Sequence, residues 1–255
     1  MGGDLVLYDQ SGGVARMTIN RPDAANALNQ DVRDGLFDGF RRFIDDDAAL
    51  VLILTGTGER AFSAGADLKE MAATGLAVPP ADYLPYLGRN LHTDKPVIAA
   101  VNGVAYAGGF FLAQMCDLVV AAEHARFAIT EAKWSRGAPW AAPLPWLIPP
   151  RVALELMITA EPISARRAYE VGLVNQVVPG PELSEAAEAL AGRIVANAPL
   201  AVRAAKAMVY AAAERGWSEA LDEGYRIFEP VYRSADAQEG PRAFQEKRSP
   251  RWQGR

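Results

Sequence analysis

Two short glycine-rich segments carry the first chemical signal of this sequence. One is "FSAGADLKEM" at residues 62–71 and the other is "AYAGGFFLAQ" at 105–114, and each follows an apolar run and opens a helical pattern. The first backbone N–H groups of a helix have no partner within it, and negative charge is favoured beside them. Two such turns side by side would form a two-donor oxyanion hole. Two tight turns that merely pack against a sheet fit the spacing equally well.

Other catalytic patterns find little support. The segment "GTGERA" at 56–61 fits a loose dinucleotide-binding fingerprint, but no helix begins directly after its glycines. A Gly-x-Ser-x-Gly elbow is absent, and the two histidines, His92 and His124, stand alone. With one cysteine, Cys116, the sequence offers no cluster of metal ligands. We therefore expect no metal site, and structural or surface roles for both histidines.

Composition bounds the class of protein. The chain has 255 residues, of which 50% are hydrophobic, and this suits one compact domain with at most a small appended part. A net charge of −5 argues against nucleic acid as a partner. A lone cysteine excludes an internal disulfide and favours a reducing compartment. The start "MGGDLVLYDQ" fits neither a secretory signal nor the myristoylation pattern, and no long uncharged apolar run follows. We expect a cytoplasmic protein with no membrane partner.

The elements that must position the glycine segments form an α/β pattern. Continuous apolar runs predict strands that are buried on both faces of a sheet, and a helix between two of them implies right-handed crossover units. The pattern predicts a hairpin over 5–19 turned at 11–13, a helix over about 30–45, strands at 50–56, 95–103 and 117–122, and a helix at 108–116.

The rest of the chain has mainly helical patterns. The segment "SARRAYEVG" predicts a helix that ends at Gly172, and 173–178 predicts a short strand. Three amphipathic patterns then follow, separated by glycine and proline. We expect a core with the chemical site over 1–195 and a helical region over 196–255 that makes contacts between subunits.

Taken together, these segments resemble the crotonase, or enoyl-CoA hydratase/isomerase, superfamily. Five segments match its motifs in the correct order: "NRPDAANAL", "AFSAGADLKEM", "KPVIAAVNGVAYAGGFFLAQMCDLVVAAEHARF", "ISARRAYEVGLVNQVV" and "EGPRAFQEKRSPRW". The resemblance covers nearly the whole chain. It implies a crotonase (ClpP/crotonase-like) α/β fold of repeated β-β-α units, with C-terminal helices that build a homotrimer or homohexamer. It also implies an acyl-CoA thioester as substrate, with coenzyme A part of that substrate and no separate cofactor.

Carried over by motif, the resemblance assigns the contacts of the thioester and of coenzyme A. The backbone N–H groups of Ala66 and Gly108 would hold the thioester oxygen as it becomes an enolate, and losing one such donor costs about 3–4 kcal/mol in other enzymes. Asp67 is expected to cap the helix that it begins, whereas Lys69 and Glu70 are expected to face solvent. The further coenzyme A contacts would be Ala24, Ala25, Ser63, Ala64, Asp67 and Leu68, with Phe244 and Lys247 reaching the coenzyme A of a neighbouring subunit.

One position departs from the hydratases of the superfamily, which carry two glutamates. Phe111 stands at the first position, while Glu131 in "FAITEAK" matches the second, preceded by Thr130 in place of the usual proline. Hydration is usually described with both carboxylates holding the water, and phenylalanine cannot do this. The resemblance places Phe110, Phe111, Pro139 and Trp140 at the acyl pocket. The sequence leaves open which of the two phenylalanines points into the site.

A single carboxylate beside an oxyanion hole still suffices to move a double bond, because one base can remove an α-proton and return it at the γ carbon. We expect Glu131 to be this acid/base, with a pKa raised by burial, although a strand-end salt bridge would be the purely structural alternative. A hydratase or dehydratase with a substitute acid, and an inactive acyl-CoA-binding protein, remain open. The C-terminal tail resembles carnitinyl-CoA dehydratase-like members. Trp134, Trp140 and Trp146 fit either pocket walls or core equally well.

Overall fold

The computed structural model describes residues 4–255, so Met1–Gly3 of the N-terminal segment interpreted above lie outside the described residues. Its largest element is a six-stranded sheet in the order β1-β2-β3-β5-β7-β10. The first two strands form the predicted antiparallel hairpin, and each later strand lies parallel to its neighbours. The strands are β1 (Val6–Ser11), β2 (Val14–Ile19), β3 (Val51–Gly56), β5 (Val97–Val101), β7 (Leu118–Ala122) and β10 (Gln176–Val178).

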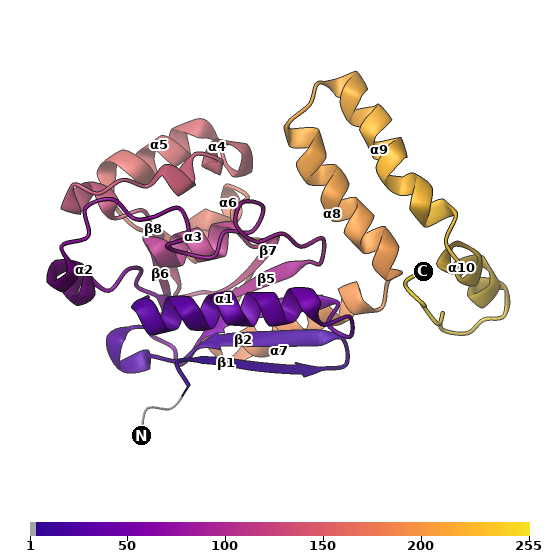
Figure 1. The fold of residues 1–255 in the computed structure, drawn as a ribbon, viewed down its shortest axis with the longest axis horizontal. Coiled ribbons are helices and arrows are strands. Elements are labelled where there is room, and N and C mark those ends of the chain that lie inside the picture. The colour runs from indigo at the N-terminus through magenta and orange to yellow at the C-terminus, as the bar shows by residue number, and fades with distance from the viewer. Residues whose placement is uncertain (1–3) are drawn as a thin grey trace.

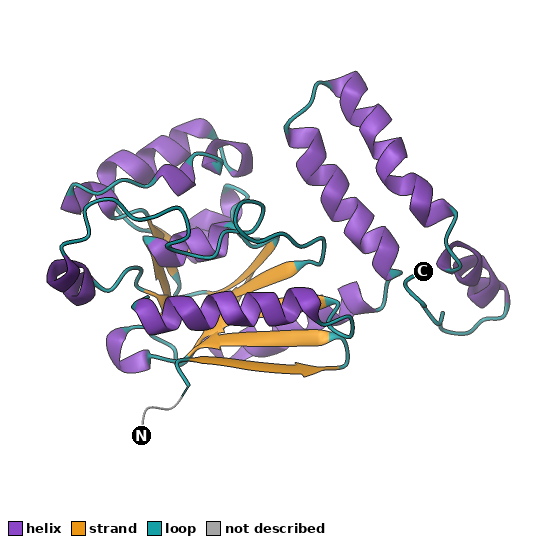
Figure 2. Ribbon diagram, in the orientation of Figure 1, coloured by secondary structure: helices purple, strands orange, loops and turns teal. Residues whose placement is uncertain are grey.

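Both faces of this sheet are covered (Figures 1 and 2). Helix α1 (Gln30–Asp45) packs on one face and α7 (Leu183–Val195) on the other. Side chains alternate along β3, so Leu52 joins the core cluster under α1 while Ile53 joins the cluster under α7. Burial on two faces explains why these strands are continuous apolar runs in the sequence.

A second, smaller sheet was not predicted. Its order is β4-β6-β8-β9, and its strands are β4 (Ala61–Ser63), β6 (Val104–Tyr106), β8 (Arg126–Ala128) and β9 (Ile163–Ser164). Strands of two or three residues are too short to show a period of two. Each of β4, β6 and β8 follows directly on a long strand of the first sheet, and α2 (Leu68–Thr74) and α3 (Gly108–Gln114) follow β4 and β6. The chain therefore repeats the predicted β-β-α unit.

Local signals set the ends of the predicted helices. Asn29 caps α1 by accepting a hydrogen bond from the N–H of Val32. The helix predicted up to Gly172 is α6 (Ala165–Glu170), capped at its start by Ser164, and Gly172 has a positive φ of 89°. The other helical segments are α4 (Leu144–Leu147), α5 (Pro150–Thr159), η1 (Pro22–Ala24), η2 (Glu131–Trp134), η3 (Pro139–Ala141) and η4 (Gly180–Glu182).

The C-terminal helices extend away from this core. Figure 1 shows α8 (Pro199–Ala213) and α9 (Trp217–Tyr232) as an antiparallel pair, followed by α10 (Asp236–Gln245). Asp117 anchors α8, because its carboxylate accepts hydrogen bonds of 2.8 Å from Lys206 and of 2.8 Å from Tyr210. Large apolar side chains of this region are exposed in the single chain. Its contacts with other subunits stay a prediction. Within residues 4–255, no helix has the length and apolar character to cross a membrane.

Candidate active site

The two glycine segments meet in the structure. They follow β4 and β6, which are parallel neighbours, so both turns lie at the same edge of the smaller sheet. Gly65 has a φ of 90°, and a Cβ placed on it would lie 3.0 Å from the nitrogen of Gly108. A Cβ on Gly109 would lie only 2.1 Å from the carbonyl oxygen of Ser63. Glycine is required at both positions, because the two backbones touch there.

The backbone around Gly108 is held in a strained conformation. Ala107 has a φ of 50° and a ψ of −119°, a region that non-glycine residues adopt rarely and that costs about 1–3 kcal/mol. Its N–H donates to the carbonyl of Ala128 at 2.9 Å, and its own carbonyl accepts from Phe111 at 3.0 Å. The peptide that carries the Gly108 N–H is therefore fixed on both sides. Within residues 4–255, neither this N–H nor that of Ala66 donates to a turn or loop carbonyl, as an oxyanion hole requires.

The residues predicted to contact coenzyme A lie on two adjoining loops. The N–H of Ala64 donates to the carbonyl of Ala25 at 3.0 Å, which holds the end of η1 against the segment that contains Ser63 and Ala64. Asp67 caps α2 as predicted, accepting from the N–H groups of Lys69 and Glu70. A hydrogen bond from Arg21, at 2.6 Å, keeps the pKa of the Asp67 carboxyl below its usual value. Two further members of this set adjoin these loops, since Ala24 ends η1 and Leu68 begins α2.

Glu131 begins η2, three residues after the end of β8, and β8 is the neighbour of β6. Its side chain is half-buried, and Oε2 is buried without a hydrogen-bond partner. Burial raises the pKa of Glu131 to about 7, against weaker opposing contributions that include its own backbone N–H and the side chain of Trp140. Within the described chain Glu131 forms no salt bridge, and its role as the acid/base stays a prediction.

Phe110 and Phe111 are both buried in the core, and each meets Trp140. The Phe111 ring packs edge-on against Tyr86 with ring centroids 4.8 Å apart, and lies 5.6 Å from the Trp140 ring. The Phe110 ring lies 6.0 Å from Trp140. Pro139 is exposed, as are Trp134 and Trp146 at 60% and 69%, so of the three tryptophans considered only Trp140 joins this aromatic cluster. The assignment of an acyl pocket to these residues stays a prediction.

The interpretation of Glu70 was wrong. We expected it to face solvent, but its carboxylate is paired at 2.6 Å with Arg33, a residue of α1 that is only 5% exposed. The sequence contains a signal for this: Arg33 lies three residues before Leu36 and seven before Phe40, on the apolar face of the predicted helix. A charge on that face needs a buried partner. Lys69, in contrast, is exposed as expected.

The remaining predicted residues lie apart from this site. Phe244 on α10 is 88% exposed, and α10 lies at the opposite end of the molecule from α2 (Figure 1), so a role of Phe244 and Lys247 toward a neighbouring subunit stays a prediction. His124 is structural, because its Nε2 contacts the carbonyls of Glu59 and Asn102. His92 lies at the surface. In the described part of the chain no group of metal-ligating side chains forms.

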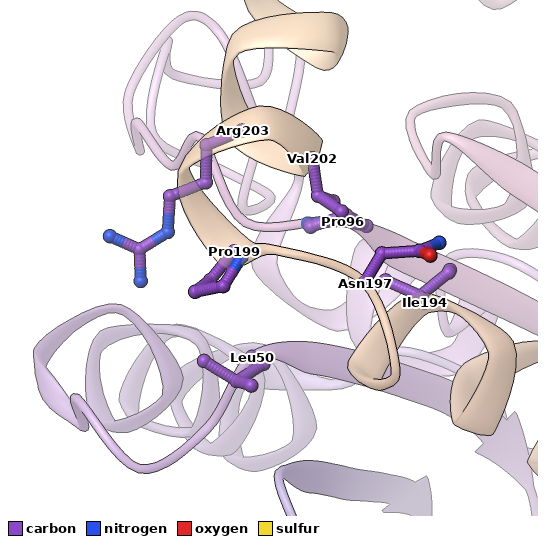
Figure 3. A pocket seen from close by; sticks show the side chains of 7 residues that line it. All are labelled: Leu50, Pro96, Ile194, Asn197, Pro199, Val202 and Arg203. Carbon is purple, nitrogen blue, oxygen red and sulfur yellow. The ribbon is translucent and has the colours of Figure 1, made fainter. Parts of the chain in front are cut away.

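Two hollows lie elsewhere and do not belong to this site. Figure 3 shows a small crevice at the amino ends of β3 and β5, lined by Leu50, Pro96 and residues around the start of α8. A larger cavity of about 320 Å³ lies on the α7 side of the six-stranded sheet, between Thr55 and Ser184. The glycine turns lie instead beyond the carboxyl ends of the long strands, on the α3 side.

Comparison with known proteins finds matches that extend over nearly the whole chain. A family model described as enoyl-CoA hydratase/isomerase matches residues 9–255. The chain belongs to the enoyl-CoA hydratase/isomerase family. It is therefore an enzyme of the crotonase superfamily and has the crotonase fold, as the motifs predicted.

Individual members of the enoyl-CoA hydratase/isomerase family are similar over their full length. Carnitinyl-CoA dehydratase of Salmonella typhi is 42% identical over 260 residues, which cover 96% of this chain and 97% of that protein. The crystal structure of an enoyl-CoA hydratase from Mycobacterium tuberculosis H37Rv superimposes with a TM-score of 0.88 at 38% identity, over 99% of this chain and 100% of that one. An enoyl-CoA hydratase from Bacillus anthracis gives 0.88 at 34% identity, over 98% and 100%.

Proposed function

We propose that this enzyme acts on an acyl-CoA thioester through an enolate, with Glu131 as its single acid/base. The observation that carries the proposal is the contrast between two positions. Phe111 is packed into an aromatic cluster, whereas Glu131 is a half-buried carboxyl group without a salt-bridge partner in the described residues. One carboxylate with a pKa of about 7 suits a group that must accept and return a proton near neutral pH.

The proposed chemistry begins with the removal of a proton from the α carbon of the thioester. The proton moves to the Glu131 carboxylate, and the electron pair of the C–H bond moves toward the thioester oxygen. The N–H groups of Ala66 and Gly108 stabilise the negative charge that develops on that oxygen. In an isomerisation, Glu131 then returns its proton to the γ carbon, so that the double bond moves and Glu131 regains its charge.

Dehydration of a 3-hydroxyacyl-CoA is the second candidate, and the 42% identity to proteins named carnitinyl-CoA dehydratase favours it. The first step is the same. Glu131, now protonated, then gives its proton to the leaving β-hydroxyl group as the enolate expels it, so water and a 2-enoyl thioester result. This sequence needs no carboxylate at Phe111, because the same group acts first as base and then as acid.

The rest of the molecule is assigned by the family resemblance. We place coenzyme A against the loops of Ala24–Ala25 and Ser63–Leu68, and the enzyme in the cytoplasm. We further propose a homotrimer or homohexamer joined through the C-terminal helices. The exposed apolar side chains that support this are Tyr210, Trp217, Leu221, Tyr225, Tyr232 and Phe244.

Proton exchange in D2O tests the proposed function directly. Saturated, 2-enoyl, 3-enoyl and 3-hydroxyacyl-CoA thioesters are followed by NMR at the α and γ carbons. We expect exchange of the α-proton of the saturated thioester, together with either double-bond migration or loss of water, and the product separates the two candidates. If the thioesters bind and none exchanges, the protein is an acyl-CoA-binding protein and the catalytic assignment of Glu131 fails.

The exchange reaction should depend on pH with a midpoint near the pKa of Glu131, which is about 7. The base is the ionised form, and its fraction rises with pH, so the rate should increase roughly tenfold per pH unit below the midpoint and level off above it. Measuring kcat/KM between pH 5 and pH 9 checks this. A midpoint near 4.5, the usual value for glutamate, would show that burial does not shift the working pKa.

A further inference from the structure

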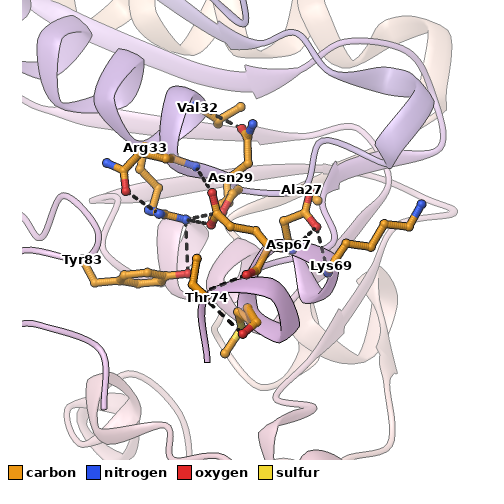
Figure 4. A network of polar contacts seen from close by, with 12 residues as sticks. Ala27, Asn29, Val32, Arg33, Asp67, Lys69, Thr74 and Tyr83 are labelled. Carbon is orange, nitrogen blue, oxygen red and sulfur yellow. Dashed lines mark hydrogen bonds and ion pairs between the residues drawn. The ribbon is translucent and has the colours of Figure 1, made fainter. Parts of the chain in front are cut away.

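Arg33 is a buried charge on α1 that reaches three other parts of the chain (Figure 4). Its Nη1 donates to the carbonyl of Leu28 at 2.9 Å, to the carboxylate of Glu70 at 2.6 Å and to the hydroxyl of Tyr83 at 3.2 Å. Its Nη2 donates to the side chain of Gln30 at 2.7 Å. The guanidinium also lies over the ring of Tyr83, 4.2 Å from its centroid. Each of the first three contacts joins Arg33 to a segment that adjoins the glycine turns.

The contact with Leu28 leads to the donor Ala66. The N–H of Leu28 donates to the carbonyl of Gly65 at 2.8 Å, and Leu28 forms an isolated parallel bridge with Ala66. The side chain of Leu28 also lies beside Gly108, 3.1 Å from the place that a Cβ would take there. Arg33 therefore binds the carbonyl group of Leu28, the residue whose N–H holds Gly65 and whose side chain lies beside Gly108.

The contact with Glu70 leads to the first turn of α2, which begins directly after Ala66 and Asp67. The same carboxylate accepts a hydrogen bond of 2.7 Å from the N–H of Gln30 at the start of α1. The pair of Arg33 and Glu70 thus joins the starts of two helices. The ion pair of Arg21 and Asp67, at 2.6 Å, joins the same turn to the segment before α1. Together these pairs fix where the loop of Ala66 ends.

The contact with Tyr83 leads to the irregular segment of residues 75–96, between α2 and β5. Long irregular segments in compact domains usually have a function. Leu84 of this segment lies 3.4 Å from the place of a Cβ on Gly108, and Tyr86 packs on Phe111. The segment therefore lies against the glycine turn and the aromatic cluster. Arg33 is the side chain that stacks on it from α1.

We propose that Arg33 is a positioning residue, which holds the oxyanion donor Ala66 and the segment 75–96 in a fixed relation to each other. The proposal rests on the function proposed above for Ala66 and Gly108. Buried ion pairs add little net stability, and the best-attested reason to retain them is that they fix one geometry. A planar guanidinium suits this role, because it presents several donors at fixed angles and stacks on an aromatic ring.

The infrared C=O stretch of bound butyryl-CoA, labelled with 13C at the thioester carbonyl, reports the oxyanion donors directly. Hydrogen bonds to the carbonyl oxygen lower its frequency, and this polarisation does not need Glu131. The measurement is made in a Glu131→Gln background, so that no turnover disturbs the complex. We expect Arg33→Met to lose most of the frequency shift caused by binding. In the otherwise unchanged enzyme, Arg33→Met should slow exchange about 10- to 100-fold, the cost typical of a small misplacement.

Three further variants separate geometry from charge and from folding. Arg41→Met removes an exposed arginine of the same helix that forms a surface ion pair with Asp38, and it should keep the full shift. Arg33→Lys keeps the charge but not the planar fork, so it should rescue little of the shift. Tyr83→Phe keeps the stacked ring and removes the hydroxyl, so it should lose a smaller part. The last two variants also give the answer if Arg33→Met does not fold.

The outcomes distinguish this proposal from the function on which it rests. A full frequency shift in folded Arg33→Met, or full rescue by Arg33→Lys, overturns the positioning role of Arg33 and leaves Ala66 and Gly108 as donors. A bound thioester that shows no shift in the protein with native Arg33 overturns the donor assignment and, with it, this proposal. The dependence of exchange on Glu131 is measured separately, in the protein with native Arg33, and it tests the acid/base assignment independently of the infrared result.

Discussion

Glu131→Gln is expected to slow α-proton exchange by about 10³-fold or more, within the 10²- to 10⁴-fold range that a general base typically supplies. Glutamine has nearly the same shape and cannot accept the proton. Binding of the thioester should stay within a few-fold of the original affinity, because Ala66, Gly108 and the coenzyme A loops are untouched. NMR exchange rates and calorimetric binding check the two parts. The matched control is Glu161→Gln. It removes an exposed carboxylate that is paired with Lys133, a residue of η2 like Glu131, and it should keep the full rate.

The same substitution should make the protein more stable at pH 8. The pKa of Glu131 is about 7 in the folded chain and 4.5 when unperturbed, so the fold favours the neutral carboxyl group. Its contribution to stability is complete below pH 4.5 and is lost as the pH rises through 7. Glutamine stays neutral, so the variant should gain about 1–3 kcal/mol in the free energy of unfolding at pH 8 and nothing at pH 4. A variant that loses both activity and stability at pH 8 would indicate a structural role.

Much of the fold follows from the sequence because the long strands and the helix α1 carry strong periodic signals. The apolar run at 50–56 gives β3, and the pattern of Val32, Leu36 and Phe40 gives α1. The smaller sheet could not be found in this way. Its strands have two or three residues, and they pair only because the long strands bring them together. Tertiary placement therefore decides the elements that carry the glycine turns.

The sequence predicted the reacting groups of the candidate site better than the contacts that hold them in place. The glycine turns, the cap at Asp67 and the lone carboxyl group of Glu131 follow from residue types and motif order. The partner of Glu70 does not. Arg33 on the apolar face of α1 indicates that a partner is needed but not which one, since Glu70 lies 37 residues away in the sequence and a glutamate on the first turn of a short helix usually faces water. The packing of Trp140 on Phe110 likewise depends on tertiary contact between η3 and α3, which no local pattern specifies.

Gly65→Ala adds a single methyl group between the two turns, and it should slow exchange about 100-fold. A Cβ at this position would lie 2.8 Å from the Cβ of Ala107, 2.8 Å from the carbonyl oxygen of Tyr106 and 3.0 Å from the nitrogen of Gly108. Two of these atoms are backbone, so relief requires the two turns to move apart. Ala66 directly follows Gly65, and the Gly108 nitrogen is one of the contact atoms. Moving the turns apart therefore separates the two donors and weakens the hold on one oxygen.

The control for this change is Gly58→Ala. Gly58 has a φ of 83°, close to the 90° of Gly65, but a Cβ there would meet nothing within 4 Å. Both variants therefore carry the strain of a positive φ, about 1 kcal/mol, and only Gly65→Ala adds the collision between the turns. We expect Gly58→Ala to lose stability alone, while Gly65→Ala also loses exchange and the infrared shift of the bound carbonyl. Equal activity losses in the two variants would attribute the effect to backbone strain and would contradict a site in which two touching turns share the enolate oxygen.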